Sequence, residues 1–341
     1  MKGKKVYTIF FICLITLMSV LAGCKGNETT SSSTENSNIS SKKEMPEKVE
    51  KIKVATVSNT ITFLPFYVAQ EKGFFKKYNL DVELTSIEGG VVALRGLQIG
   101  DLQFMAGLPE SIITSVSEGS NIQIIGTLSD KTLYSVFVRP EIKKVEDLKG
   151  KAVAVLQPGN GVDITMRWWL KQHGLKPDKD VRVVSAGGTP SRVAALKNNQ
   201  VQATILQPPN DLDGEKAGMK RFAVLSEELT SYNHSVISTN GDIIKKQPEV
   251  VRAFMAATAD AIEFIKDPAN REEAIEIGMK SFETDKETTS KSLDFVIDSI
   301  PSKGKLNVEG IEWAIEAVEE VGSIKNKVHV DDVINESFYA K

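Results

Sequence analysis

Two glycine-containing segments carry the residues best suited to hold a small polar ligand. The first, Gln-Pro-Gly-Asn-Gly-Val-Asp at 157–163, lies between an expected strand and an expected helix. Gly159, Asn160 and Gly161 can turn backbone N–H groups toward a ligand at the helix start, which favours an anion. Asp163 would repel a bare anion unless its carboxylate caps the helix. The presence of Asp163 therefore weakens the case for a bare anion, and capping is the role that we expect for it.

The second segment is Gly-Gly-Thr-Pro-Ser-Arg at 187–192. Thr189 suits the N-cap of a helix and Pro190 its first position. Arg192 follows about one turn later, where its guanidinium can bind a ligand carboxylate through two hydrogen bonds. A surface ion pair is the alternative role for Arg192. We include Gly188, Thr189 and Arg192 in the candidate site.

Other candidates follow further strands, because ligands of open α/β sheets bind outside the carboxyl ends of strands. Thr60 and Thr62 belong to a hydroxyl-rich segment, and helix capping is their alternative role. Ser129 can bind a ligand or form part of a hinge, and Tyr232 can stack on a planar ligand. The remaining candidates are Asn59, Phe63, Gly89, Gly90, Gly107, Gln207 and Asn210.

The sequence lacks the common catalytic patterns. No H-E-x-x-H, G-x-S-x-G or P-loop motif occurs, and the histidines at 173, 234 and 329 have unlike surroundings. Of the two cysteines, Cys13 lies in an apolar run near the N-terminus that we expect to be cleaved off, and Cys24 alone cannot form a disulfide or cysteine–metal framework. The net charge of −3 argues against a nucleic-acid partner. We therefore expect no enzyme activity, no metal and no cofactor.

The first 24 residues indicate export. Lys2, Lys4 and Lys5 precede an apolar run at 6–22, as in a signal peptide. The tetrapeptide that ends at Cys24, Leu-Ala-Gly-Cys, resembles a bacterial lipobox, and an uncleaved signal anchor is the alternative. The resemblance implies a signal peptide at 1–23 and a lipidated Cys24. Residues 24–50 are polar and predict a disordered tether.

The rest of the chain alternates short apolar runs with longer helical patterns, which predicts an α/β fold with mostly parallel sheets. The rhythm restarts near residue 145, so we expect two lobes. Lobe 1 is expected at 51–138 and 233–341 and lobe 2 at 139–232, with crossings at 134–138 and 234–238. The expected strands are 51–57, 81–87, 104–106, 121–128, 151–156, 181–184 and 203–206. The expected helices are 65–77, 91–99, 109–118, 161–173, 190–198, 248–265, 271–281, 286–297 and 308–321.

Several segments, in order along residues 51–325, resemble one family. They are 64–75, 78–83, 145–155, 193–203 and 247–254. They are similar to the nitrate, sulfonate, taurine and thiamine-precursor family of ABC-transporter solute-binding proteins. The resemblance implies a two-lobed periplasmic-binding-protein fold of type II, with two crossovers and hinge closure on the ligand.

The resemblance also implies a function. We expect an extracytoplasmic lipoprotein, held at the cell membrane by its lipid, that delivers a small-molecule ligand to an ABC importer permease. The expected ligand is small, polar and organic: sulfonate-like, taurine-like, or a nitrogen heterocycle such as a thiamine-pyrimidine precursor. We expect a monomer. The alternatives are an enzyme resembling the pyrimidine synthases, which use a cysteine-rich segment that this chain lacks, and a ligand-sensing module.

Overall fold

The computed structural model describes residues 45–339. The predicted signal peptide, Cys24 and most of the predicted tether lie outside these residues. The tether prediction is wrong at its end, because Pro46 is already buried and its carbonyl accepts a hydrogen bond from the Asn79 side chain at 2.8 Å. The first strand then begins at Glu50.

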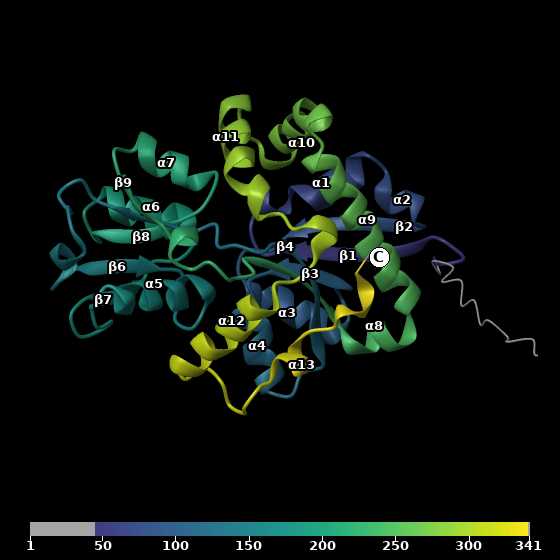
Figure 1. The fold of residues 1–341 in the computed structure, drawn as a ribbon, viewed down its shortest axis with the longest axis horizontal. Helices are drawn as coiled ribbons and strands as arrows, with labels where there is room; N and C mark the ends of the chain where they lie inside the picture. The colour runs from purple at the N-terminus through teal and green to yellow at the C-terminus, as the bar shows by residue number, and fades with distance from the viewer. Residues whose placement is uncertain (1–44, 340–341) are drawn as a thin grey trace, which may run out of the picture. The chain divides into compact units, whose positions relative to one another are not determined.

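Lobe 1 is built on a five-stranded sheet with the order β2-β1-β3-β10-β4 (Figure 1). β1, β2 and β3 pair in parallel, and β10 is antiparallel to both of its neighbours. The strands are β1 (Glu50–Thr56), β2 (Leu80–Ser86), β3 (Phe104–Gly107), β4 (Ile122–Ser129) and β10 (Ser235–Asn240). Every residue of β3 is buried, since helices cover both faces of this sheet.

Lobe 2 repeats this plan with the order β7-β6-β8-β5-β9. β6, β7 and β8 pair in parallel, and β5 is antiparallel to β8 and β9. The strands are β5 (Ser135–Val138), β6 (Ala152–Val155), β7 (Arg182–Ser185), β8 (Ala203–Leu206) and β9 (Lys220–Val224). The mostly parallel sheets predicted from the sequence are confirmed.

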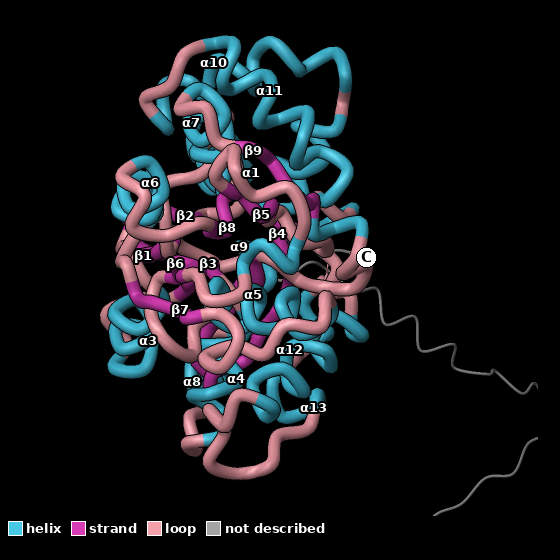
Figure 2. Tube along the Cα trace, turned by 90° about the vertical axis from the view of Figure 1, so that its left-hand side faces the viewer, coloured by secondary structure: helices cyan, strands magenta, loops and turns pink. Residues whose placement is uncertain are grey.

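The helices lie on both sides of each sheet (Figures 1 and 2). In lobe 1, one apolar cluster lies between the sheet and α1, α9 and α10, and a second lies under α3, α4 and α12. The helices of lobe 1 are α1 (Leu64–Glu71), α2 (Phe74–Lys77), α3 (Gly90–Ile99), α4 (Pro109–Ser117), α8 (Gly241–Lys246), α9 (Pro248–Lys266), α10 (Arg271–Phe282), α11 (Lys286–Val296), α12 (Val308–Glu320) and α13 (Val330–Val333). Those of lobe 2 are α5 (Gly161–Gln172), α6 (Thr189–Lys197) and α7 (Asn210–Lys216). Within residues 45–339, none of these helices combines the length and apolarity that a membrane crossing requires.

The lobe boundary differs from the prediction at β5. The sequence-based boundary assigned residues up to 138 to lobe 1, but β5 hydrogen-bonds to β8 and β9 in the second sheet. The chain therefore leaves lobe 1 after β4, and the segment that crosses precedes residue 135. The error arose because a short apolar strand carries no signal of which sheet it joins.

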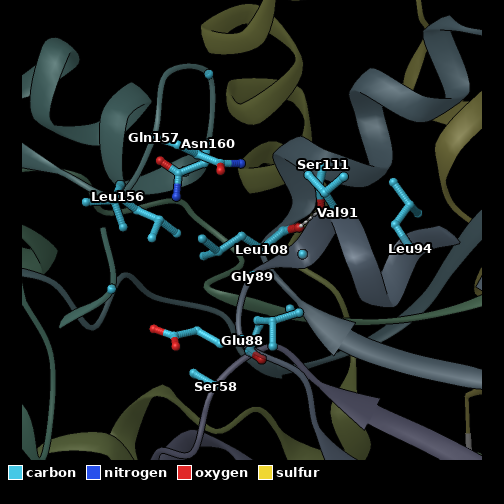
Figure 3. A pocket seen from close by; sticks show the side chains of 18 of the residues that line it. Ser58, Glu88, Gly89, Val91, Leu94, Leu108, Ser111, Leu156, Gln157 and Asn160 are labelled. Atoms are coloured by element: carbon cyan, nitrogen blue, oxygen red, sulfur yellow. Dashed lines mark hydrogen bonds between the residues drawn. The ribbon is translucent and has the colours of Figure 1, made fainter. Parts of the chain in front are cut away.

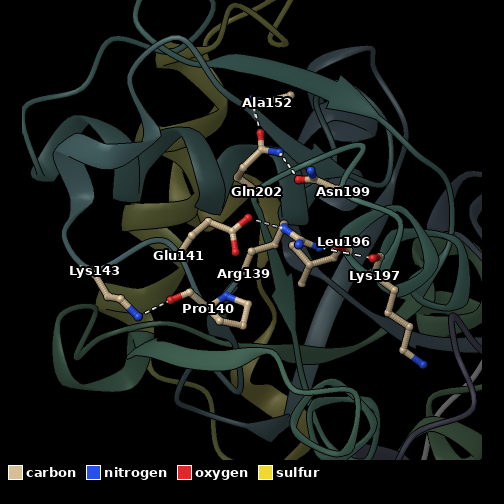
Figure 4. Close-up of polar contacts among 9 residues, drawn as sticks. All are labelled: Arg139, Pro140, Glu141, Lys143, Ala152, Leu196, Lys197, Asn199 and Gln202. Atoms are coloured by element: carbon tan, nitrogen blue, oxygen red, sulfur yellow. Dashed lines mark hydrogen bonds and ion pairs between the residues drawn. The ribbon is translucent and has the colours of Figure 1, made fainter.

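Polar contacts at the far end of lobe 2 fix the position of α6 (Figure 4). Arg139, just after β5, donates from one terminal nitrogen to the carbonyls of Leu196 at 2.9 Å and Lys197 at 3.3 Å. Its Nε also pairs with Glu141 at 2.6 Å. A cation at the last carbonyls of a helix also suits the negative end of the helix dipole. These contacts tie the C-terminus of α6 to the sheet of lobe 2. The N-terminus of the same helix is thereby held in place.

Candidate functional site

A cavity of about 450 Å³ lies between the two lobes, at the carboxyl ends of their parallel strands. This volume falls within the range of small-molecule sites. Its walls come from the segments after β1, β2 and β3 in lobe 1 and after β6, β7 and β8 in lobe 2. We call this cavity the cleft. Figure 3 shows side chains of both lobes around it.

Most of the residues proposed from the sequence line the cleft. The structure brings together Thr60, Thr62, Phe63, Gly89, Gly90, Gly107, Gly159, Asn160, Gly161, Gly188, Thr189, Arg192 and Gln207. Several elements far apart in the sequence thus contribute to one cavity, as the strand-end rule predicts.

Three of the proposed residues lie elsewhere. Asn59 is exposed outside the cleft lining. Ser129 is buried at the end of β4, where its hydroxyl donates to the Lys131 carbonyl at 2.9 Å and so shapes the crossing. Asn210 begins α7 and lines a separate hollow of lobe 2 together with Pro190 and Lys216. Their prediction as ligand contacts rested on position along the chain, which does not fix the direction of a side chain.

Tyr232 also lies outside the cleft lining, behind one of its walls. It is fully buried, its ring meets Trp313 edge-on, and its hydroxyl donates to Oε1 of Glu110 at 2.7 Å. Burial raises the pKa of Glu110 to about 7, while the hydrogen bond from Tyr232 opposes that rise. The second carboxylate oxygen of Glu110, Oε2, has no hydrogen-bond partner among the described residues. Tyr232 is therefore a packing residue in this structure, because Glu110 already takes its hydroxyl.

The loop before α5 is an internally capped helix start. Asn160 is the N-cap, and its side-chain oxygen accepts from the backbone N–H of Asp163 at 3.1 Å. The Asp163 carboxylate accepts from the Gly159 N–H at 2.7 Å and from Nε of Arg167 at 2.7 Å. The cap predicted for Asp163 is therefore made by Asn160, while Asp163 holds the loop just before the helix through Gly159 and pairs with Arg167. Because the Asp163 carboxylate accepts from the Gly159 N–H, that N–H group is not free to bind an anion.

Arg192 is buried, with 4% of its surface exposed, and it lines the cleft. It donates to the Gly187 carbonyl at 3.2 Å, to Oγ1 of Thr189 at 3.1 Å and to the Ile205 carbonyl at 3.3 Å. All three acceptors are neutral, so the alternative of a surface ion pair is wrong. Thr189 is not the N-cap as predicted, because α6 starts at Thr189 itself and Gly188 takes that position.

Three buried polar atoms that belong to cleft-lining residues have no hydrogen-bond partner within residues 45–339. They are Oγ1 of Thr62 in lobe 1, Oγ of Ser235 at the start of β10, and Nε of Arg192 in lobe 2. A buried polar group without a partner costs about 1–3 kcal/mol. The structure provides no helix-capping hydrogen bond for Thr60 or Thr62, which removes the alternative role weighed for them.

His234 positions another cleft residue, Gln207. Burial lowers the pKa of His234 to about 3, so its ring is neutral near pH 7. Its Nδ1 accepts from the Leu133 N–H at 3.4 Å, which leaves the proton on Nε2. That N–H donates to Oε1 of Gln207 at 2.5 Å. The amide nitrogen of Gln207 is thereby left as a donor.

The sequence-based list missed several residues that line the cleft. They are chiefly Glu88, Ser111, Tyr134, Gln157, His234 and Ser235. Glu88 immediately precedes the glycine pair that was chosen, and Gln157 begins the chosen loop, so extending each segment by one or two residues would have found them. Tyr134 and His234 lie beside the crossings, where the lobes meet. Within the described chain, no three His, Cys, Asp or Glu side chains gather as metal ligands would.

Several curated relatives match a part of this chain, and two of them illustrate the group. A bicarbonate transport ATP-binding protein, CmpC, from Synechocystis sp. is 26% identical over 234 residues, which covers 62% of this chain and 35% of the relative. A nitrate/nitrite binding protein, NrtA, from Nostoc sp. is 26% identical over 257 residues, which covers 66% of this chain and 58% of the relative. This chain therefore spans less than two thirds of the length of either relative.

Solved structures with the same fold cover most of the chain. The periplasmic aliphatic sulphonate binding protein SsuA from Escherichia coli is 17% identical, with a TM-score of 0.71 over 86% of this chain and 94% of that chain. The periplasmic nitrate-binding protein NrtA from Synechocystis is 18% identical, with a TM-score of 0.71 over 86% and 88%. A Candida albicans protein described as having the generic periplasmic binding protein fold is 18% identical, with a TM-score of 0.70 over 86% and 98%.

These neighbours confirm the predicted fold class: α/β, with two lobes of the periplasmic-binding-protein type. The sequence itself matches the model of one family, described as NMT1/THI5 like, over residues 60–271. Since that match covers more than half of the chain, this protein belongs to the NMT1/THI5-like family.

Proposed function

We propose that this chain is the solute-binding component of an ABC importer and that it captures a small polar organic ligand in the cleft. The observation that carries this proposal is the set of unpartnered polar atoms on residues that line one cavity from both lobes, at Thr62, Ser235 and Arg192. A ligand that bonds to all three satisfies groups that otherwise remain buried without partners. The relatives named for bicarbonate, nitrate and sulphonate transport support the same class of function.

The cleft geometry suits a capture mechanism. A ligand that contacts both lobes binds the closed arrangement more tightly than the open one and so shifts the equilibrium toward closure. The crossings before β5 and before β10 are the segments where the chain rotates. An importer permease then distinguishes the closed, loaded protein from the open, empty one.

The lining favours an organic ligand with several polar groups. Donors at Arg192 and Gln207 lie in lobe 2, and the hydroxyl of Thr62 lies in lobe 1. Phe63 and Tyr134 add aromatic surface for a planar group. A taurine-like molecule or a nitrogen heterocycle fits this mixture better than a small inorganic anion, because Asp163 already accepts one of the loop N–H groups.

We further propose that the protein works outside the cytoplasm as a lipoprotein. The support is the sequence Leu-Ala-Gly-Cys that ends at Cys24 and follows a charged and then apolar segment. Two of the structural neighbours are periplasmic proteins, which supports a location outside the cytoplasm. In this proposal, the monomeric protein is held at the membrane by its lipid near the permease.

The alternative is an enzyme resembling the pyrimidine synthases, for which His234 in the cleft is the relevant residue. Its ring nitrogens contact Gln207 and the Leu133 N–H, and its low pKa keeps it neutral. A histidine with both nitrogens engaged orients a neighbour and is poorly placed to transfer protons. The geometry of His234 therefore favours binding over catalysis.

A thermal-shift screen of the purified chain tests the proposal. The panel consists of sulfonates, amino sulfonates, pyrimidines, flavins and aromatic acids. We expect one chemical class to raise the melting temperature with saturation, since a ligand that binds only the folded state stabilises it. If no compound raises the melting temperature while one of them is chemically converted, the importer function is contradicted and the enzyme alternative holds.

A further inference from the structure

Glu88 projects from lobe 1 into the cleft from a fixed backbone position. The N–H of Ile87 donates to the Thr56 carbonyl at 2.8 Å, and the N–H of Gly89 donates to the Val57 carbonyl at 3.1 Å. Both bonds join the segment to the end of β1, on either side of Glu88. Figure 3 shows the side chain extending away from this backbone into the cleft. Its carboxylate has no hydrogen bond or ion pair within the residues that the structure describes.

The Glu88 carboxylate lies against the start of α6 in the opposite lobe. A Cβ added to Gly188 would fall 1.9 Å from Oε1 of Glu88, so any larger residue there would displace this carboxylate. Gly188 is the N-cap of α6, and in the described chain no side chain caps that helix. A helix N-terminus carries partial positive charge and unpaired N–H groups. The Glu88 carboxylate therefore lies beside the start of α6 without a hydrogen bond to it, where its negative charge faces an approaching anion.

A buried positive charge lies one turn further along the same helix. Arg192 has only neutral hydrogen-bond acceptors, and its Nε has no partner among residues 45–339. Burial lowers the pKa of Arg192, while the nearby Tyr134 and Glu88 oppose that change. Glu88 is thus the carboxylate that lies near enough to act on Arg192, although it makes no direct ion pair with it. Because Arg139 ties the far end of α6 to the sheet of lobe 2, the start of α6 keeps its place within that lobe.

The other lobe 2 helix at the cleft follows the same pattern. At the start of α5, the chain's own Asp163 accepts the Gly159 N–H. A carboxylate of this protein therefore lies beside each of the two helix starts that face the cleft. A negatively charged ligand at either helix start has to approach one of these carboxylates, and like charges repel.

We propose that Glu88 is a specificity-determining residue that excludes anions from the α6 end of the cleft and selects a ligand carrying an ammonium or N–H-bearing group there. This inference rests on the proposed function and names the ligand class of the same site. An amino group satisfies the free carboxylate of Glu88, while an acceptor group on the same ligand reaches Nε of Arg192. A molecule that lacks the amino group leaves Glu88 unpaired against the bound ligand.

Matched pairs of small molecules test this role by titration calorimetry. Taurine and isethionate differ by an ammonium in place of a hydroxyl, as do β-alanine and 3-hydroxypropionate, and sulfate serves as a bare anion. In Glu88→Gln, we expect binding of the hydroxyl compounds or sulfate to tighten at least tenfold relative to the wild type. Glu88→Asp, which retracts the carboxylate by one methylene, is expected to give a smaller gain. Glu83→Gln removes an exposed carboxylate of β2 in the same lobe and is expected to change nothing.

If Glu88→Gln binds none of these anions more tightly than the wild type does, the role of Glu88 is overturned. An equal gain in Glu83→Gln would also overturn it, because the effect would then be one of net charge alone. These results leave the importer function standing. That function fails separately, when the wild type binds no compound of the wider screening panel.

Discussion

Glu110 is a carboxylic acid buried where the lobes meet, and its energetics depend on pH. Its pKa rises from a usual value near 4.5 to about 7, mainly through burial. Between these two values the folded state binds more protons than the unfolded state, so stability falls as pH rises. Below pH 4.5 the stabilising contribution of protonated Glu110 to the free energy of unfolding is fully present, and above about pH 7 it is lost. The size of the loss is about 3 kcal/mol.

Glu110→Gln is predicted to flatten this pH dependence. A glutamine keeps an oxygen that accepts from the Tyr232 hydroxyl, but it cannot ionise. We expect urea unfolding at pH 5 and pH 8 to give a smaller difference for the variant than for the wild type. An unchanged difference would mean that Glu110 does not lose a proton in this range. Glu118→Gln, at a partly exposed carboxylate that pairs with Lys325, is the control.

The candidate residues were predicted from their positions after expected strands. Such a position does not determine which partner a side chain contacts in the folded protein. The prediction placed Asp163 correctly at the start of a helix, but the residue that caps this helix is Asn160, and Asp163 accepts from Gly159 just before it. It failed for Tyr232, because the partner of that hydroxyl, Glu110, lies 122 residues away in the chain. It missed Glu88, whose contact with Gly188 forms only when the two lobes meet.

At the scale of elements, strong periodic patterns were predictable and weak ones were not. The predicted helices at 161–173 and 248–265 match α5 and α9 closely. The predicted helix at 65–77 is broken in the structure, because Gly73 adopts a positive φ of 72° between α1 and α2. α7 and β9 were not predicted. The first contains two aspartates and a glycine, and the second is an edge strand with no fully buried residue.

Asp163→Asn is predicted to weaken the start of α5. The variant loses the charged acceptor for the Gly159 N–H and the ion pair with Arg167. We expect thermal or urea unfolding to show a loss of about 1–2 kcal/mol, similar to the loss of a helix cap. Asp213→Asn changes an exposed aspartate in the first turn of α7 and is expected to cost much less. Equal losses in the two variants would contradict a specific role of Asp163 at this helix start.

At the scale of the whole molecule, the two sheets have matching strand orders, each with its antiparallel strand in the fourth position. The sequence predicted two α/β halves from the restart of the strand–helix rhythm. It did not predict that β5 belongs to the second sheet, because pairing between strands depends on contacts distant in sequence. The cleft follows from this arrangement, since equivalent strand ends of both lobes line it.

The proposed lipid anchor gives a prediction for the complete protein in a bacterial host. Cys24→Ser removes the thiol that would be acylated, so we expect the protein to move from the membrane fraction to the soluble extracytoplasmic fraction. Cell fractionation followed by immunoblotting measures this. A variant that stays in the membrane fraction at wild-type levels would contradict lipidation at Cys24 and favour an uncleaved signal anchor.

The central claim, that one ligand is held by both lobes, is tested most directly by calorimetric titration of the stabilising compound into three proteins. These are the wild type, Thr62→Val in lobe 1 and Arg192→Lys in lobe 2. We expect one ligand per wild-type chain and at least tenfold weaker binding in each variant, since each loses an unpartnered donor or acceptor of a residue that lines the cleft. Arg182→Lys, at an exposed position on β7, should bind as the wild type does. Unchanged affinity in either Thr62→Val or Arg192→Lys would contradict capture between the two lobes.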